Sequence, residues 1–446
     1  MKKKIGIVSL GCPKNLIDTE VMLGLLNKGG YEITSDETAA NIIIVNTCGF
    51  IESAKQESIN AILEMAEYKK SNCELLIVIG CLAERYHRQI REQIPEVDSI
   101  AGTGEYGNIV SIINNAYSGK KTELYGKLNE ISYLENERIL TENKGSAYIK
   151  IAEGCGNHCT YCIIPALRGR YRSRKIEDIV SEAKWLSDKG IKEIILVAQD
   201  TTKYGVDLYN EKKLPFLIRE LSKIVGIEWI RVLYCYPQDV TEELIEEFAS
   251  NKKLVKYIDI PIQHFSDKIL KLMGRKETNA LISNLIKMLR KRIPGIIIRT
   301  TLITGFPGED AADHEIMIKN ISSFRFDRLG VFVYSNEEGT PAFQMKNQVS
   351  KAVKNQRYHK LMSIQSKIAA ELNMDRIDKI YAVLIEGISD DGIFYFGRSY
   401  AESPDIDGLI HFTSSVPLKI GTFADVKILN TEDYDLIGDV LYESAK

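Results

Sequence analysis

The chain has 446 residues, of which 44% are hydrophobic and 27% are charged, with a formal net charge of −3. This composition excludes a disordered chain and a strongly basic nucleic-acid binder, and the length predicts two or three domains. Three lysines precede an apolar stretch at the N-terminus, but the stretch ends at Leu10 without a cleavage site, and no later apolar run is long enough to cross a bilayer. We therefore expect a cytoplasmic protein with no membrane partner, whose eight cysteines serve metal binding or catalysis rather than disulfides.

The first hundred residues predict a parallel sheet covered by helices. Strand-like runs at 4–10, 41–46 and 75–80 alternate with segments in which apolar residues recur at helical spacing. Such alternation is typical of a three-layer α/β domain with the sheet in the middle. We place this domain at residues 1–116.

Three cysteines lie at the ends of these runs, and we call Cys12, Cys48 and Cys81 the N-terminal trio. The C-terminal ends of parallel strands share one edge, where open α/β sheets bind ligands. The three thiols are therefore expected to converge and to hold an iron–sulfur cluster with one open iron. Pro13 begins a helix, which places Cys12 where the helix dipole favours a thiolate. Three unrelated buried cysteines are the alternative.

The rest of the chain divides into a linker and two further domains. Residues 117–145 are polar with weak periodicity, which predicts a linker. Residues 146–374 contain six strand-like runs separated by helical segments, so we expect an open, partial (β/α)6 barrel that ends in a long helix at 351–374. Residues 375–446 contain short alternating strands and predict a small antiparallel β-barrel. The six runs of the central domain are 147–151, 193–197, 229–233, 257–260, 296–303 and 329–334.

The sharpest local pattern is C-x3-C-x2-C, formed by Cys155, Cys159 and Cys162 in a segment that we call the cysteine loop. Three thiolates leave one iron of a four-iron cluster open to an exogenous ligand, which indicates chemistry rather than electron storage. A structural zinc site with His158 as its fourth ligand is the alternative, but no second ligand pair at finger-like spacing lies nearby.

Several polar residues mark further candidate positions. Gln199 and Gln263 follow the second and fourth barrel strands, at the rim where barrel enzymes place their sites, although ordinary strand-end residues are equally compatible. A basic run at 168–175 follows the cysteine loop and suits a carboxylate or a phosphate, but a solvated surface loop is the simpler interpretation. Cys73 and Cys235 are interpreted as packing residues.

With these motifs the chain resembles the radical S-adenosylmethionine methylthiotransferases. The cysteine loop, with Tyr161 before its last cysteine, matches the radical S-adenosylmethionine motif, the N-terminal trio matches the first domain of these enzymes, and the tail resembles their TRAM barrel. The resemblance implies two [4Fe-4S] clusters that face one cavity, S-adenosylmethionine (SAM) on the iron of the cysteine loop, and an electron donor and a sulfur donor as partners. The residues that it places at SAM are Tyr161, Gln199, Gln263 and Arg299.

Two branches of this family compete. One modifies tRNA adenosines, and the other inserts a methylthio group at the β-carbon of an aspartate in ribosomal protein S-twelve of the small subunit. Residues 10–16, 334–341 and 397–401 resemble the second branch. Residues 375–446 hold 6 basic and 14 acidic side chains, and such a tail repels RNA and attracts a basic ribosomal protein. We therefore expect a monomer that modifies this basic protein; tRNA modification and a non-catalytic iron–sulfur redox protein are the alternatives.

Overall fold

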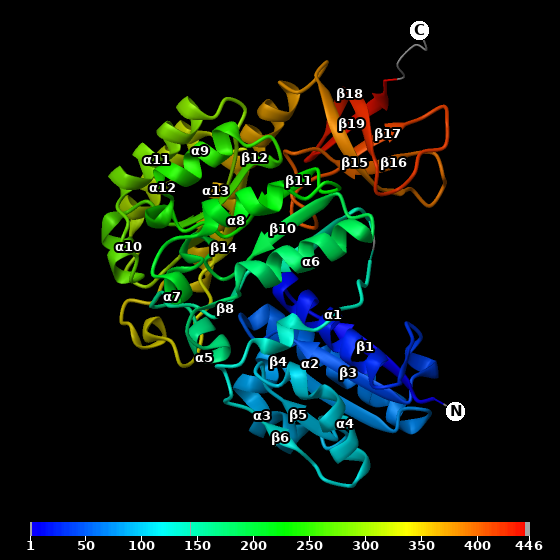
Figure 1. Cartoon of the computed structure of the whole chain (residues 1–446). Coiled ribbons are helices and arrows are strands. Elements are labelled where there is room, and N and C mark those ends of the chain that lie inside the picture. Colours follow the sequence, from blue (N-terminus) through cyan, green and yellow to red (C-terminus); the bar gives the residue numbers. More distant parts are fainter. Residues whose placement is uncertain (1, 143, 442–446) are drawn as a thin grey trace. The chain divides into compact units, whose positions relative to one another are not determined.

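The computed structural model describes residues 2–142 and 144–441, and the chain divides into two compact units (Figure 1). Residue 143 of the expected linker, residue 1, and residues 442–446 of the expected tail lie outside this description. The first unit combines Met1–Thr141, Lys150–Arg174 and Ser335–Phe343, and the second combines Glu142–Ile149, Lys175–Tyr334 and Gln344–Lys446. The N-terminal trio and the cysteine loop therefore belong to the same unit.

The first unit is built on a six-stranded parallel sheet in the order β2-β1-β3-β4-β5-β6. Its inner strands β3 and β4 are buried throughout and rich in Ile, Val and Leu, as a sheet covered on both faces requires. The strands are β1 (Lys4–Ser9), β2 (Glu32–Ile33), β3 (Ile42–Thr47), β4 (Leu75–Gly80), β5 (Ser99–Ala101) and β6 (Glu123–Leu124).

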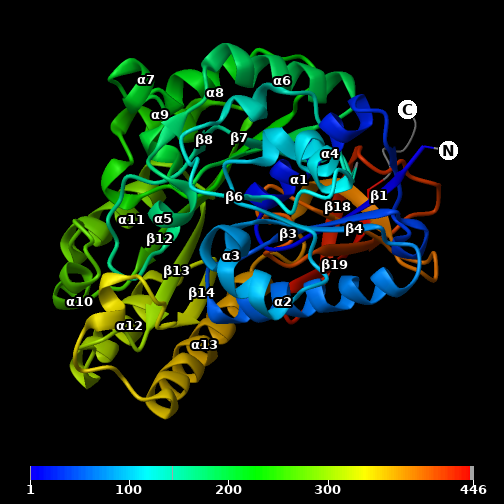
Figure 2. The ribbon, with the colours of Figure 1, turned by 90° about the horizontal axis from the view of Figure 1, so that it is seen from below.

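Helices cover both faces of this sheet and complete three layers (Figure 2). On one face, Val45, Val78 and Ile100 pack with apolar side chains of α2 and α3; α1 and α4 lie on the other face. The segment expected to be a linker adds β6 to the sheet edge and buries Tyr133 and Leu134 in this unit. The helices are α1 (Pro13–Lys28), α2 (Glu52–Glu67), α3 (Cys81–Gln93) and α4 (Ile109–Tyr117).

Six strands form the central sheet in the order β14-β13-β12-β11-β10-β7, and the pairs from β10 to β14 are parallel. Among the residues that the structure describes, β7 and β14 each pair on one side only, so the expected open (β/α)6 barrel is confirmed. The strands are β7 (Ser146–Lys150), β10 (Glu193–Val197), β11 (Trp229–Val232), β12 (Leu254–Gln263), β13 (Ile297–Thr304) and β14 (Arg328–Val333). The helices between and after them are α6 (Ile176–Asp188), α7 (Val206–Tyr209), α8 (Leu214–Ser222), α9 (Glu242–Ser250), α10 (Asp267–Leu272), α11 (Asn279–Arg292), α12 (Ala311–Phe324) and α13 (Lys351–Met374).

The C-terminal segment forms a closed five-stranded barrel, drawn in orange to red in Figure 1. Its core contains Val383, Ile410, Phe412 and Val426. The pairs are antiparallel as expected, except that β17 and β19 are parallel. The strands are β15 (Ile380–Ile388), β16 (Tyr395–Arg398), β17 (Ile410–Thr413), β18 (Phe423–Glu432) and β19 (Asp435–Val440).

Buried ion pairs join this small barrel to the central sheet. The guanidinium of Arg398 lies 2.6 Å from a carboxylate oxygen of Glu386 in β15 and 2.7 Å from one of Glu193 in β10. Glu193 also accepts a hydrogen bond from Arg231 of β11 at 2.7 Å. The side chains of Arg398, Glu193 and Arg231 are fully buried, so the two elements share one charged core.

Candidate functional site

The N-terminal trio gathers at one edge of the first sheet. Strands β1, β3 and β4 are adjacent and parallel, and each is followed within three residues by its cysteine: Cys12 caps α1, Cys48 follows β3, and Cys81 begins α3. Gly11 brings the backbone close to the second of these, because a Cβ added there would lie 2.8 Å from the Cβ of Cys48 and 3.1 Å from its Sγ. The three cysteines therefore share a small space.

The thiols of the trio influence one another's ionisation. Burial and the nearby thiols of Cys81 and Cys12 raise the pKa of Cys48 to about 12. Burial also raises the pKa of Cys81, against the charge of Arg168. At Cys12 burial acts in the same direction, but Lys14, Arg168 and two backbone N–H groups outweigh it and lower the pKa. Thiols that repel one another when ionised are stabilised by a bound cation.

The cysteine loop lies between the short strand β8 (Ala152–Glu153) and α5 (Ile164–Arg168). Its entry is held by β9 (Arg172–Ser173), which pairs with β8, and by the backbone N–H of Cys155, which donates to the carbonyl of Gly169 at 3.1 Å. Gly154 has a φ of +78°, and a Cβ there would lie 2.2 Å from the carbonyl oxygen of Arg170, so the turn requires glycine. Burial, together with the other two thiols of the loop, raises the pKa of Cys162 to about 12.

Both cysteine groups have the donor set of an iron–sulfur cluster. Within residues 2–142 and 144–441, no three side chains of His, Cys, Asp or Glu are arranged to hold a single metal ion. The thiolates of a four-iron cluster each bind a different iron, so their sulfurs stand farther apart than the ligands of one ion. A sulfur-only set of three thiols, with a buried guanidinium beside Cys81, fits such a cluster.

The basic run after the cysteine loop is only in part the solvated surface loop that we expected, since Arg170 and Lys175 are exposed. The side chains of Arg168 and Arg174 are buried, because each meets acceptors that are distant in sequence. Arg174 donates to the carbonyl of Lys150 at 2.9 Å, and Arg168 donates to Asp18 and to the Sγ of Cys81. The sequence signal for this role is an arginine at the end of a helix that follows a cysteine motif, which is too common to be decisive.

The residues predicted to contact SAM fall in both units. Tyr161 lies in the cysteine loop of the first unit, whereas Gln199 and Gln263 follow and end strands β10 and β12 of the second. Arg299 is the third residue of β13, away from the C-terminal strand ends, and its guanidinium pairs with Asp259 at 2.7 Å. The two glutamines thus lie at the rim, and the arginine does not.

Gln263 has two features of a binding residue. Its φ of +74° is unusual for a residue with a side chain, and such strain concentrates at functional sites. Its amide oxygen is buried and has no hydrogen-bond partner among the described residues. Burying an unpaired acceptor costs free energy, so a ligand donor at this position would compensate for it.

A buried carboxylate shapes the turn after β13. Glu309 accepts hydrogen bonds from the backbone N–H groups of Gly305 at 2.5 Å and Phe306 at 3.2 Å, and Arg357 donates to it at 2.9 Å. Burial opposes ionisation, but His264, Arg357 and the backbone donors outweigh it and lower the pKa of Glu309. This glutamate was not singled out from the sequence; it fixes the turn of Gly305, Pro307 and Gly308 that follows β13.

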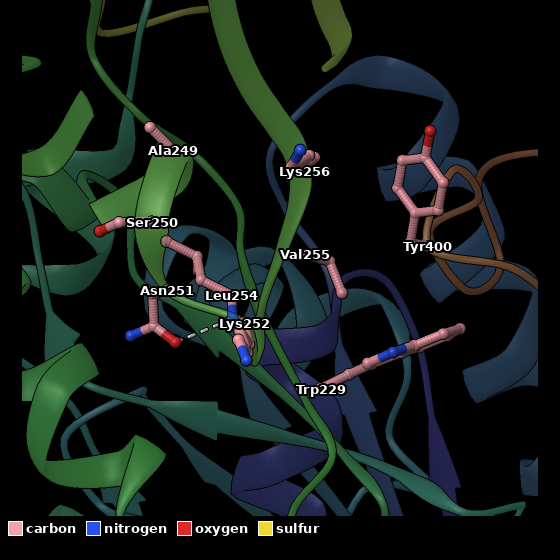
Figure 3. A pocket seen from close by; sticks show the side chains of 9 residues that line it. All are labelled: Trp229, Ala249, Ser250, Asn251, Lys252, Leu254, Val255, Lys256 and Tyr400. Atoms are coloured by element: carbon pink, nitrogen blue, oxygen red, sulfur yellow. Dashed lines mark hydrogen bonds between the residues drawn. The ribbon is translucent and has the colours of Figure 1, made fainter. Parts of the chain in front are cut away.

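A cavity of about 320 Å³ opens at the opposite end of the central strands (Figure 3). Trp229 begins β11, Leu254 begins β12, and Tyr400 of the small barrel completes the wall. The N-terminal strand ends face this cavity, so it is separate from the strand ends that carry Gln199 and Gln263.

The two remaining cysteines are buried in packed cores. Cys73 belongs to the core between the first sheet and helices α2 and α3. Cys235 is fully buried and lies 3.7 Å from the hydroxyl of Thr201. Burial raises the pKa of both thiols, as it does for a side chain packed in an apolar core, and this environment agrees with a packing role.

Three family descriptions match consecutive parts of the chain. Residues 4–102 match the uncharacterized protein family UPF0004, residues 149–321 match the radical SAM superfamily, and residues 377–441 match the TRAM domain. The three matches correspond to the first sheet, the central sheet and the small barrel. No helix of the described residues is apolar and long enough to span a membrane.

Full-length relatives are similar over the whole chain. A protein of Acetivibrio thermocellus named ribosomal protein uS12 methylthiotransferase RimO is 58% identical, and the alignment covers 100% of both chains. A protein of Clostridium tetani with the same name is 51% identical, again over 100% of both chains. Among solved structures, the radical S-adenosylmethionine methyltransferase TsrM from Kitasatospora setae is similar in fold, with a TM-score of 0.58, 14% identity and 77% of each chain covered.

Proposed function

This chain belongs to the RimO family of radical SAM methylthiotransferases, and we propose that it inserts a methylthio group at the β-carbon of an aspartate in ribosomal protein uS12. The observation that carries the proposal is identity of 58% over the full length to a protein of that name. A ribosomal substrate would place the reaction in the cytoplasm, where ribosomal proteins are made.

We assign the metal sites to the six cysteines at the two predicted positions. The N-terminal trio would hold one [4Fe-4S] cluster and the cysteine loop the other. When bound, these clusters and SAM would supply a carbon-centred radical and a methylated sulfur, which ordinary side chains cannot provide. The reaction also requires an electron donor and a sulfur donor, which we propose as partners.

The protein's own side chains would position these groups. Gln263 would offer its buried amide oxygen to a donor on the cofactor, and Gln199 lies at the neighbouring rim position. Tyr161 would lie against the cofactor from the cysteine loop. Glu309 would act by holding the turn after β13, because backbone N–H groups and Arg357 already occupy its carboxylate. Arg299, which is paired with Asp259, is the weakest member of the predicted cofactor set.

Charge on the small barrel supports a basic protein as the substrate. Among residues 375–441, nine acidic side chains are exposed, whereas only two lysines, Lys379 and Lys419, are exposed. A surface of this sign repels phosphate backbones and attracts a basic protein at low and moderate salt. The alternative of tRNA modification would need a positive surface on this barrel.

The proposal is tested by offering both substrates to the reconstituted protein. The chain, prepared without oxygen, is incubated with SAM, sulfide and a chemical reductant, together with recombinant uS12 or with total tRNA. Mass spectrometry should show a methylthio group in place of a hydrogen on one aspartate of uS12. Unmodified uS12 together with methylthio-adenosine in the tRNA would contradict the proposal and favour the other branch.

A further inference from the structure

Arg168 follows the cysteine loop in the chain, and its side chain contacts a cysteine of the N-terminal trio. It ends helix α5, six residues after Cys162, and only 3% of its side chain is exposed. Its Nε donates to the Sγ of Cys81 at 3.4 Å, and its Nη1 donates to Asp18 at 2.7 Å and to Glu153 at 3.0 Å. All three nitrogens are engaged, since Nη2 donates to the side-chain oxygen of Asn15.

The guanidinium belongs to a buried network whose charges balance. Lys150 pairs with Asp18 and also with Glu153, at 2.7 Å from the latter, and none of these side chains exposes more than 4% of its surface. Two cations therefore face two carboxylates. The Nε–H that points to Cys81 takes no part in these ion pairs, because Arg168 binds both carboxylates through Nη1.

The contact with Cys81 is held in place by packing as well as by charge. Cys81, Ile163 and Leu167 form one small apolar cluster, so the helix that carries Arg168 lies against the thiol. Asn15, which accepts from the guanidinium, donates to the carbonyls of Leu10 and Thr47, the last residues before the turns that carry Cys12 and Cys48. The guanidinium is thereby fixed relative to all three ligand turns.

We propose that Arg168 is a positioning residue that orients Cys81 and raises the reduction potential of the cluster on the N-terminal trio. The inference rests on the proposed function, since it needs a cluster on these cysteines. Reduction adds one negative charge to the cluster and its ligand sulfurs. A hydrogen bond from a buried cation to a ligand sulfur stabilises the more negative state, and hydrogen bonds to sulfur are among the factors that set cluster potentials.

The test measures the potential of this cluster alone. Replacing Cys155, Cys159 and Cys162 by Ala in the full chain leaves one cluster, whose reduction is followed by electron paramagnetic resonance during a redox titration. In this background, Asp18→Asn with Arg168→Gln removes one charge of each sign, so the network stays balanced. We expect the reduction equilibrium to fall at least tenfold, which is about 59 mV for one electron.

Two controls separate the sulfur contact from general effects. Asp18→Asn alone keeps Arg168 and its contact with Cys81, and because it removes a buried negative charge it should raise the potential rather than lower it; a fall equal to that of the double variant would overturn the role of Arg168. Glu20→Gln with Arg138→Gln removes another buried pair of the first unit, whose atoms lie 2.9 Å apart, and should not shift the potential. If the first pair fails to fold, Arg168→Lys provides the readout, because an ammonium cannot serve Cys81 and both carboxylates together and should also lower the potential.

Each outcome is decisive for one of the two proposals. An unchanged potential with four irons bound, in the double variant Asp18→Asn/Arg168→Gln or in Arg168→Lys, overturns the role of Arg168 and leaves the proposed function intact. An equal shift in the control pair also overturns it. A background protein that binds no iron through the N-terminal trio contradicts the proposed function itself.

Discussion

At the scale of single residues, Gly11 and the N-terminal trio show how closely the backbone and the thiols are fitted. Gly11 has a φ of +90° and lies against Cys48, so both its backbone angle and its lack of a side chain are used. Gly30, in the same unit, has a similar φ of +88° but no atom within 4 Å of an added Cβ. Substitution of Gly30 therefore tests backbone strain alone, whereas substitution of Gly11 tests strain together with contact with Cys48.

This pair yields a prediction about cluster binding. Gly11→Ala should displace Cys48 and lower the iron content of the reconstituted protein by up to half, because one of two clusters would lose a ligand position. Gly30→Ala should cost about 1 kcal/mol of stability through strain alone and leave the iron content unchanged. The measurement is the iron and sulfide content of both variants and of the natural protein. Equal iron in all three would contradict the proposed fit around Cys48.

The positions of some site residues could be predicted from the sequence, and those of others could not. The convergence of Cys12, Cys48 and Cys81 followed from parallel strands and their shared edge, which are local patterns. The burial of Arg168 did not, because its partners Asp18 and Cys81 are 150 and 87 positions away. An arginine in a basic run has no local mark that distinguishes a solvated side chain from one at the centre of a network.

At the scale of elements, the buried ion pairs under the small barrel are the clearest feature. Glu402 accepts from Arg328 of β14 at 2.9 Å and from the backbone N–H of Ser399 at 3.0 Å, and it also pairs with Arg376. It is fully covered, and although burial opposes ionisation, these partners lower its pKa to about 2. One carboxylate thus connects the central sheet to the small barrel.

This shift predicts a pH-dependent contribution to stability. A carboxyl group with a lowered folded-state pKa stabilises the fold above its unfolded pKa, and the contribution is lost as pH falls toward the folded value. From the ordinary 4.5 to about 2, the full contribution is on the order of 3 kcal/mol. The difference in unfolding free energy between the natural protein and Glu402→Gln should shrink from about pH 5 to about pH 3. Glu432→Gln, at an exposed site, serves as the control, and a difference that does not change with pH would contradict the prediction.

Most elements were predictable, and the exceptions have physical reasons. Strands 75–80 and 193–197 and the helix at 351–374 were predicted at their observed bounds, because long periodic or buried runs leave little ambiguity. The short strands β2, β5 and β6 were missed, since two or three residues carry no period. The parallel pairing of β17 with β19 depends on barrel closure, which no local pattern encodes.

At the scale of the whole molecule, the distribution of charge separates the possible substrates. The net charge of −3 indicates no partner, but the acidic side chains gather in the small barrel. Association with a basic protein should therefore depend on this barrel and weaken with salt. The composition of the tail made this expectation possible, whereas the exposure of its carboxylates required the structure.

Charge reversal tests that expectation. Replacing Asp390, Asp425 and Glu432 by Lys should weaken binding of uS12 and reduce its dependence on salt, with little effect on iron content. A matched control reverses Asp188, Glu228 and Glu315, which are equally exposed outside the small barrel. Titration of labelled uS12 at two salt concentrations provides the measurement. Equal weakening by both triple variants would show that the small barrel has no special part in binding.

Two separate cysteine groups, the N-terminal trio and the cysteine loop, should each hold one cluster. Iron and acid-labile sulfide are measured after anaerobic reconstitution of the natural chain and of the variant with Cys12, Cys48 and Cys81 replaced by Ala. We predict about eight irons per natural chain and about four per variant, with the remaining cluster still reducible. An equal iron content in the two proteins would contradict the assignment of a cluster to the N-terminal trio.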